Sequence, residues 1–289
     1  MVTPGNVVFI EVVFFAIVLV YLVSLCVRWL IYNKMQTASY VPKVVERITD
    51  YLASFTYFQA LSTRAKMRFI KRVRGLSQTK KFVGMQGLKV TEEMKVLLSA
   101  SLVQLTFGLP SSEIRTFKKL MIYPDTFFNP ATKVQMKGFT HPVSGILAVS
   151  WPDYKHGYEI PDDNYNLGLH ELAHALHINA AKVKDKEEFS ADFRFWTEKS
   201  IRHFYDLQEQ RDDFLRDYGG TNFHEFFAVV IEHFFESPEA FLEHIPHLSI
   251  RTCAMMKQNP MNRHNDFVFD WADFPKHRRL SRISLSNGN

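Results

Sequence analysis

Residues 166–177 read Asn-Leu-Gly-Leu-His-Glu-Leu-Ala-His-Ala-Leu-His, and this stretch decides how the chain is expected to fold. Its leucines and alanines recur at helical spacing, which predicts a mostly buried helix. His170 and His174 are four residues apart, so both imidazoles project from one face of that helix. Two imidazoles at this spacing can bind one zinc ion, and Glu171 beside them is placed to act as general base toward a zinc-activated water. The motif therefore predicts a zinc site with hydrolytic chemistry.

The third metal ligand decides the subclass. The short metzincin motif requires glycine and a further histidine where this chain has His177 and Ala180, so that subclass is excluded. The alternative is a glutamate from a later helix. Glu225 and Glu232 stand out because residues 223–235 are so apolar that an unpaired carboxylate among them would be costly. They lie seven residues apart, on one helical face, so periodicity alone does not choose between them.

The elements around the motif predict the fold class. A pattern close to a capping box at Thr91 begins a core helix, and short apolar runs at 117–122 and 146–151 predict strands. A helical pattern follows over 163–215. After a loop at 218–222, another helix is predicted up to residue 236. The order of helix, small sheet and helices is typical of a mainly helical α+β domain. The second strand, from residue 145 to 151, is a candidate sheet edge on which an extended peptide could add, and an ordinary core strand is the alternative.

The first part of the chain has a different composition. Residues 7–27 are apolar except for Glu11, and as a helix they would cover about 31 Å, one bilayer core. A single N-terminal transmembrane helix is expected, because the basic leading region and cleavage site of a signal peptide are absent from this stretch. Arg28, Lys34, Lys43 and Arg47 follow it, which predicts a single-pass protein of the inner or plasma membrane with a cytoplasmic catalytic domain.

Four segments are expected: a membrane anchor over 1–34, a helical arm with a basic end over 35–80, a catalytic domain over 81–260, and an extension with a basic tail over 261–289. The arm is expected to be helical from 41 to 76. Its basic end is interpreted as a solvated helix face or a contact with anionic lipid, and nucleic acid is not favoured as a partner. The two cysteines, Cys26 and Cys253, lie far from the histidine motif and provide no disulfide framework.

Ordered blocks between about residues 61 and 250 resemble the zinc-dependent peptidase family of Mlc titration factor A, whose catalytic core is similar to that of anthrax lethal factor. The blocks include residues 81–84, 87–94, 122–124, 149–153, 166–167, 225–229, 232–235 and 238–239. The resemblance implies a zincin-like fold with Glu225 as third zinc ligand and Tyr218 facing the metal. The chain departs from the family at His177, where aspartate is common, and in its amino-terminal anchor.

These observations favour a zinc metallopeptidase of the gluzincin type that cleaves a peptide or protein substrate, with Glu171 and Tyr218 as catalytic residues. His177, Glu232 and Asn166 are candidates for contacting or orienting the ligands, and a partly buried histidine without such a role is the alternative for His177. The competing hypothesis is a regulatory binding protein that captures a transcriptional regulator and keeps the zinc site as a scaffold. A zinc hydrolase acting on a non-peptide amide is a third.

Overall fold

The computed structural model describes residues 18–28, 42–109, 114, 116–130, 133–182, 188–211 and 213–277. The chain forms two compact units, residues 1–50 and 51–289. In the first unit, residues 18–28 and 42–50 are helical. Within the described part of the chain, no helix combines the length and the apolar character needed to cross a bilayer. The predicted span over residues 7–27 lies mostly outside the described residues and stays a prediction.

The predicted helical arm is interrupted. Instead of one helix up to residue 76, the described chain has a break after residue 51, a short helix α2 (Thr56–Gln59) and a long helix α3 (Thr63–Thr79). Ser62 explains the second start, because its Oγ accepts a hydrogen bond from the Ala65 N–H at 3.3 Å. The Ser62 backbone N–H also donates to Asp266 Oδ1 at 2.6 Å, which connects the start of α3 to a turn that follows the last α-helix.

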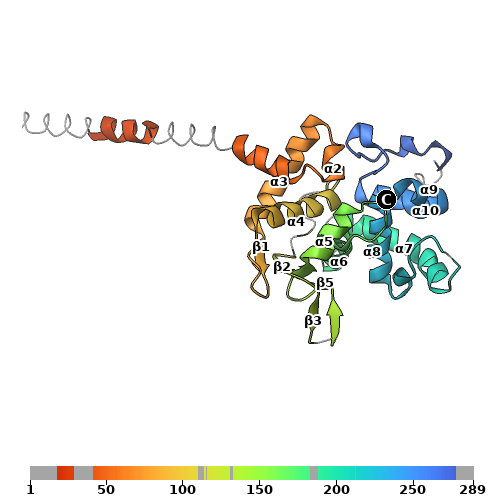
Figure 1. Ribbon diagram of the computed structural model, residues 1–289. Coiled ribbons are helices and arrows are strands. Elements are labelled where there is room, and N and C mark those ends of the chain that lie inside the picture. Colours follow the sequence, from red (N-terminus) through yellow and green to blue (C-terminus); the bar gives the residue numbers. More distant parts are fainter. Residues whose placement is uncertain are drawn as a thin grey trace, which may run out of the picture. The chain divides into compact units, whose positions relative to one another are not determined.

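A four-stranded sheet forms one side of the second unit (Figure 1). It comprises β1 (Lys81–Gly84), β2 (Lys119–Tyr123), β6 (Ile146–Ser150) and β5 (Gly138–His141), in the order β1-β2-β6-β5. The first three strands are parallel, and β5 runs antiparallel to β6. A separate hairpin is formed by β3 (Phe127–Asn129) and β4 (Val134–Met136).

The sheet order corrects one expectation. The strand around residues 146–150 is not an edge, because β6 is paired on both sides, with β2 and with β5. Four of its five residues are buried, as expected for an inner strand with a neighbour on each edge. The edge next to it is β5, whose sequence Gly-Phe-Thr-His gives no comparable apolar signal.

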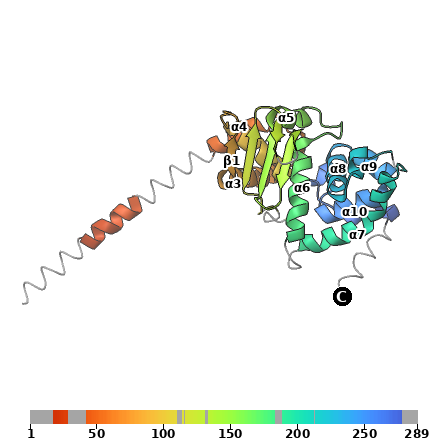
Figure 2. The ribbon, with the colours of Figure 1, turned by 90° about the horizontal axis from the view of Figure 1, so that it is seen from below.

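Three helices cover the sheet. Helix α4 (Glu92–Leu105) begins as predicted, with the Thr91 hydroxyl accepting from the Met94 N–H at 3.2 Å. Helix α5 (Trp151–Glu159) follows β6 directly. Helix α6 (Leu167–Lys182) carries the histidine motif and contacts both β5 and β6. Figure 2 shows α6 standing between the sheet and the helices of the carboxyl-terminal half.

The carboxyl-terminal half is helical. It consists of α7 (Glu188–Gln208), the 3₁₀ turn η1 (Asp217–Gly220), α8 (Phe223–Glu236), α9 (Pro238–His244) and α10 (Pro246–Met256), followed by three further 3₁₀ turns, η2 (Arg263–Asn265), η3 (Trp271–Asp273) and η4 (Pro275–His277). Asn222 starts α8, because its Oδ1 accepts from the N–H groups of His224 and Glu225 at 2.9 and 3.1 Å. Because α8 packs against α6, residues far apart in the sequence meet at one site. The expected class, a mainly helical α+β fold with a small sheet, is confirmed.

Glu236, at the end of α8, makes stability depend on pH. Burial raises the pKa of its carboxyl to about 8, although a hydrogen bond from Asn166 Nδ2 at 3.0 Å opposes the shift. Because the folded pKa exceeds the ordinary value of 4.5, the stability that the protonated form contributes is complete below pH 4.5 and is lost as pH rises through 8.

We therefore expect Glu236→Gln to raise the unfolding free energy at pH 8 by about 1–3 kcal/mol and to change it little at pH 4.5. Denaturant unfolding at both pH values, with a metal chelator present throughout, measures this difference. The exposed Glu239→Gln on α9 is the matched control. An equal effect of Glu236→Gln at both pH values would contradict the assignment.

Candidate metal centre

The two histidines of α6 and one glutamate of α8 meet at a single point. The rings of His170 and His174 lie with centroids 4.7 Å apart, as expected for positions one helical turn apart. Glu225 Oε2 is 3.0 Å from His170 Nε2 and 3.3 Å from His174 Nε2. One donor atom from each of these three residues lies within 4.8 Å of the others. The structure thus brings together the three residues expected as ligands.

These separations fit a metal ion. Zinc binds imidazole nitrogen and carboxylate oxygen at about 2.0–2.2 Å, so two ligand atoms on one tetrahedral ion lie roughly 3.3 Å apart. The distances from Glu225 Oε2 to the two Nε2 atoms are close to that value. Although burial raises the pKa of Glu225, hydrogen bonds with His170 and His174 outweigh burial and hold the pKa below its usual range. The carboxylate is therefore charged and can attract a cation.

Glu232 holds the other side of the His170 ring. Its Oε2 is 3.0 Å from His170 Nδ1, and its Oε1 accepts the Asn166 N–H at 2.9 Å. With Nδ1–H donating to Glu232, Nε2 keeps its lone pair for a metal. Burial lowers the pKa of His170, but hydrogen bonds with Glu225 and Glu232 reverse this effect and raise it to about 10. The surroundings that favour a proton on His170 would equally favour a divalent cation beside it.

Arg216 neutralises Glu232. Its guanidinium contacts Glu232 Oε2 and also lies over the Tyr165 ring, 4.1 Å from the centroid. The sequence indicated that a carboxylate in this apolar helix needs a cation, but it did not indicate Arg216, which comes from the loop before η1. The two glutamates of α8 therefore have different partners: Glu225 faces the Nε2 atoms of the two histidines, and Glu232 pairs with Arg216.

Glu171 is buried beside the histidines, with 6% of its surface exposed. Thr140 on β5 donates its hydroxyl to Glu171 Oε2 at 2.7 Å. A Cβ at Gly138, on the same strand, would lie 2.3 Å from Glu171 Oε1, so only glycine leaves room for the carboxylate. Burial raises the pKa of Glu171, and the nearby histidines and Thr140 moderate the rise. A carboxylate with a raised pKa is a better proton acceptor than an exposed one.

Tyr218 lies at the open side of the site. Its ring centroid is 5.9 Å from that of His170, and 52% of the residue is exposed. Burial raises the pKa of its hydroxyl, and the negative charges of Glu225 and Glu171 raise it further. The hydroxyl is therefore protonated at neutral pH and can donate a hydrogen bond.

His177 lies apart from the three ligand candidates. Its ring stacks on that of His224 with centroids 4.0 Å apart, and it also contacts Phe193. Burial lowers its pKa to about 3, with smaller contributions from His224 and His174. In the described part of the chain no hydrogen bond joins it to a ligand candidate, so its neutral ring has the surroundings of a packed side chain. Asn166 and Glu232, by contrast, lie where an orienting role was expected.

A cleft of about 610 Å³ opens onto one side of the candidate metal centre. His170, Glu171 and Glu232 line it together with Tyr218 and with β4 (Val134–Met136). Its size is that of a ligand site. Thr140 and Gly138 were not identified from the sequence, because β5 is short and its partner helix α6 is distant in the chain.

A helix with the HExxH motif, a glutamate from a later helix and a small sheet beside them define a metallopeptidase-like fold. The chain belongs to the family described as glucose-regulated metallo-peptidase M90, whose profile matches residues 28–252. It is 26% identical over 239 residues to Mlc titration factor A of Yersinia pestis and to that of Yersinia pseudotuberculosis, covering 74% of this chain and 86% of each relative. An uncharacterised protein of Synechocystis is 24% identical over 204 residues, 62% of this chain and 72% of the relative. The expected family is confirmed.

Proposed function

We propose that the chain is a zinc-dependent peptidase in which His170, His174 and Glu225 hold the metal. The observation that carries this proposal is the pair of distances from Glu225 Oε2 to the two imidazole Nε2 atoms, 3.0 and 3.3 Å, which match ligands of one tetrahedral ion. Two histidines and one carboxylate are the ligand set of many catalytic zinc sites, which keep one position open. Membership of a metallo-peptidase family supports the same reading.

Zinc bound here would supply Lewis acidity that makes water nucleophilic near neutral pH. Glu171 accepts the proton of the attacking water, because its carboxylate is held beside the histidines by Thr140. It then delivers this proton to the leaving amine. The Tyr218 hydroxyl donates a hydrogen bond to the oxygen on which negative charge develops. Glu232 fixes the orientation of the His170 ring through Nδ1.

The substrate class that fits the cleft is an extended peptide. Among the described residues, β5 ends the sheet order, and no strand pairs with its outer side. An extended segment can add to such an edge through main-chain hydrogen bonds. Because β5 also carries Thr140 and Gly138, which contact Glu171, a peptide on this edge would pass close to the general base.

Metal removal tests the proposal. Full-length protein is assayed on a mixed peptide library before and after treatment with a zinc chelator, and again after zinc is restored. We expect cleavage to stop with the chelator and to return with zinc, with about one zinc per chain by metal analysis. Cleavage that continues in metal-free protein would contradict the proposal, as would a zinc-loaded protein that cleaves no member of the library.

For Tyr218→Phe we expect near-normal zinc content, a kcat lowered by about 10- to 100-fold and a KM within about twofold, because the hydroxyl acts on charge that develops only in the transition state. Steady-state kinetics on one peptide substrate separate the two constants. The exposed Tyr205→Phe on α7 is the matched control. An unchanged kcat would remove Tyr218 from the mechanism.

A second candidate function is supported by the names of the relatives. Two are called Mlc titration factor A, which describes titration of Mlc. By analogy, this chain would bind a transcriptional regulator, with the metal centre as a scaffold. Under this alternative, capture of a purified regulator by the full-length protein would persist in a variant that has lost cleavage, whereas the peptidase proposal requires cleavage itself.

A further inference from the structure

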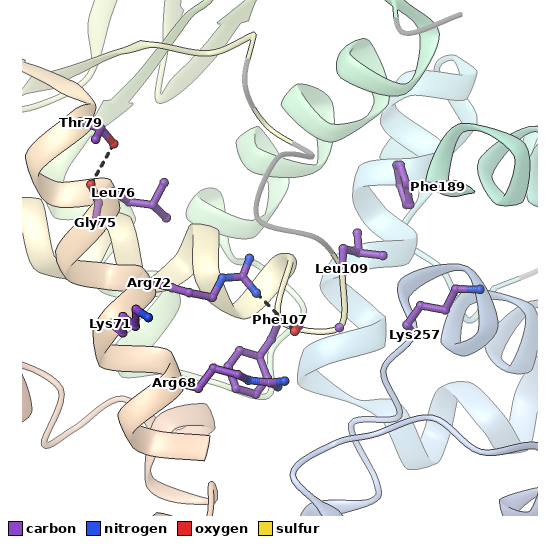
Figure 3. A pocket seen from close by; sticks show the side chains of 11 residues that line it. Arg68, Lys71, Arg72, Gly75, Leu76, Thr79, Phe107, Leu109, Phe189 and Lys257 are labelled. Carbon is purple, nitrogen blue, oxygen red and sulfur yellow. Dashed lines mark hydrogen bonds between the residues drawn. The ribbon is translucent and has the colours of Figure 1, made fainter. Parts of the chain in front are cut away.

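A second pocket, separate from the metal centre, lies between α3 and the ends of α4, α7 and α10 (Figure 3). Its volume is about 850 Å³, and it shares no lining residue with the cleft at the metal centre. One face of α3 forms a whole wall, since Arg68, Lys71, Arg72, Gly75, Leu76 and Thr79 recur at three- and four-residue spacing. Phe107, Leu109 and Phe189 add apolar lining.

The pocket is strongly basic. Four of its eleven lining residues are cations, and none is acidic. Lys257 on the far wall pairs with Asp192 at 2.7 Å. On α3, by contrast, the described residues provide no carboxylate partner for Arg68, Lys71 or Arg72. Like charges at this spacing repel each other.

The two arginines are held in place. Arg72 donates to the carbonyl oxygens of Thr106 and Phe107 at 2.9 and 3.3 Å, and to the Thr106 hydroxyl at 2.7 Å. Burial lowers the pKa of Arg72 to about 10, and the charge of Arg68 adds to this effect, so the group is still charged at neutral pH. The Arg68 guanidinium lies over the Phe107 ring, 4.0 Å from its centroid. The hydrogen bonds of Arg72 to the residues that follow α4 explain its position. They do not involve Arg68 or Lys71.

Gly75 is the second, independent feature. It lies within α3, where glycine weakens a helix relative to alanine. A Cβ at this position would meet no heavy atom within 4 Å beyond the helix backbone, so the packing of the described residues does not require glycine there. Because Gly75 lines the pocket, a side chain at this position would take up space there. Glycine at position 75 therefore leaves the pocket open beside the cations of α3.

We propose that this pocket binds an organic phosphate, with its phosphate group against Arg68, Lys71 and Arg72 and its apolar part against Leu76, Leu109 and Phe189. Arginine forks match phosphate oxygens in pairs, and a phosphate monoester carries nearly two negative charges at neutral pH. The volume is in the range of small-molecule sites. A phospholipid and a soluble phosphate ester share this chemistry.

The test is calorimetric titration of the full-length protein with phenyl phosphate, with dioctanoyl phosphatidic acid below its micelle concentration, and with inorganic phosphate. We expect saturable binding of at least one organic phosphate, weakened about tenfold or more when Arg68→Gln and Lys71→Gln are combined. The control, Arg64→Gln with Lys89→Gln, removes two exposed charges outside the pocket and is expected to bind as the unaltered protein does.

Gly75→Phe tests the shape of the site, because Gly75 lines the pocket and a Cβ at this position meets no heavy atom within 4 Å beyond the helix backbone. We expect it to abolish binding, whereas Gly75→Ala keeps binding and raises the melting temperature. Tighter binding of phosphatidic acid assigns the site to a lipid, and tighter binding of phenyl phosphate assigns it to a soluble ester. Undiminished binding in Gly75→Phe or in the double charge variant would overturn the proposal, as would inorganic phosphate binding as tightly as both esters.

Discussion

Glu171→Gln is expected to keep its zinc and to lose about 99 to 99.99% of peptide hydrolysis, the 10²- to 10⁴-fold effect typical of a general base. The amide has the size of the carboxylate, so it fits in the narrow space beside Gly138 and can still accept the Thr140 hydrogen bond. It cannot accept a proton from water. Binding and folding are thus preserved while the proton transfer is removed.

Three measurements on the same preparation make this prediction specific. Metal analysis is expected to give the zinc content of the unaltered protein, thermal melting an equal or higher midpoint because a buried charge is gone, and kinetics the loss of kcat. Glu159→Gln, an exposed change on α5, is the matched control and should be fully active. Loss of zinc in Glu171→Gln would argue that this side chain is a ligand. Full activity would refute the general base.

Glu225→Gln and Glu232→Gln are expected to differ most in zinc affinity. Zinc sites with four ligands bind with about 10–16 kcal/mol, so losing one ligand costs roughly a quarter of this, or a factor of about 100 to 1000 in affinity. This is the expectation for Glu225, whose Oε2 approaches both Nε2 atoms. Glu232 contacts only the far nitrogen of His170, and loss of such a partner weakens metal binding by about 10- to 100-fold.

Competition with a chromophoric chelator gives the two affinities, and dialysis followed by metal analysis gives the zinc retained. Glu225→Gln should lose its zinc on dialysis, whereas Glu232→Gln should retain most of it. Because Arg216 contacts Glu232, the second variant also leaves a partly buried cation unpaired, so lower thermal stability is expected there. Zinc lost only from Glu232→Gln would show that the ligand lies seven residues later than assigned.

Local sequence determined the parts of the site that depend on helix geometry. The spacing of His170 and His174 places both rings on one face wherever α6 lies, and the rings are indeed neighbours. Thr91 starts α4 for an equally local reason, since the hydrogen bond that caps the helix spans three residues. The sequence also showed that carboxylates in the apolar helix near residues 223–235 need cationic partners. None of these inferences requires knowledge of how the elements pack.

Tertiary structure decided the relations between distant segments. Glu225 and Glu232 share a helical face, so periodicity does not separate them, and the contact of α8 with α6 places one at the Nε2 side of His170 and the other at Nδ1. Sheet order placed β6 inside and β5 at the edge, which brings Thr140 to Glu171. Arg216, in the loop before η1, contacts Glu232 through the same kind of tertiary packing. The physical reason is that hydrogen bonds within a helix fix neighbours a few residues apart, whereas contacts between elements depend on how their buried surfaces fit together.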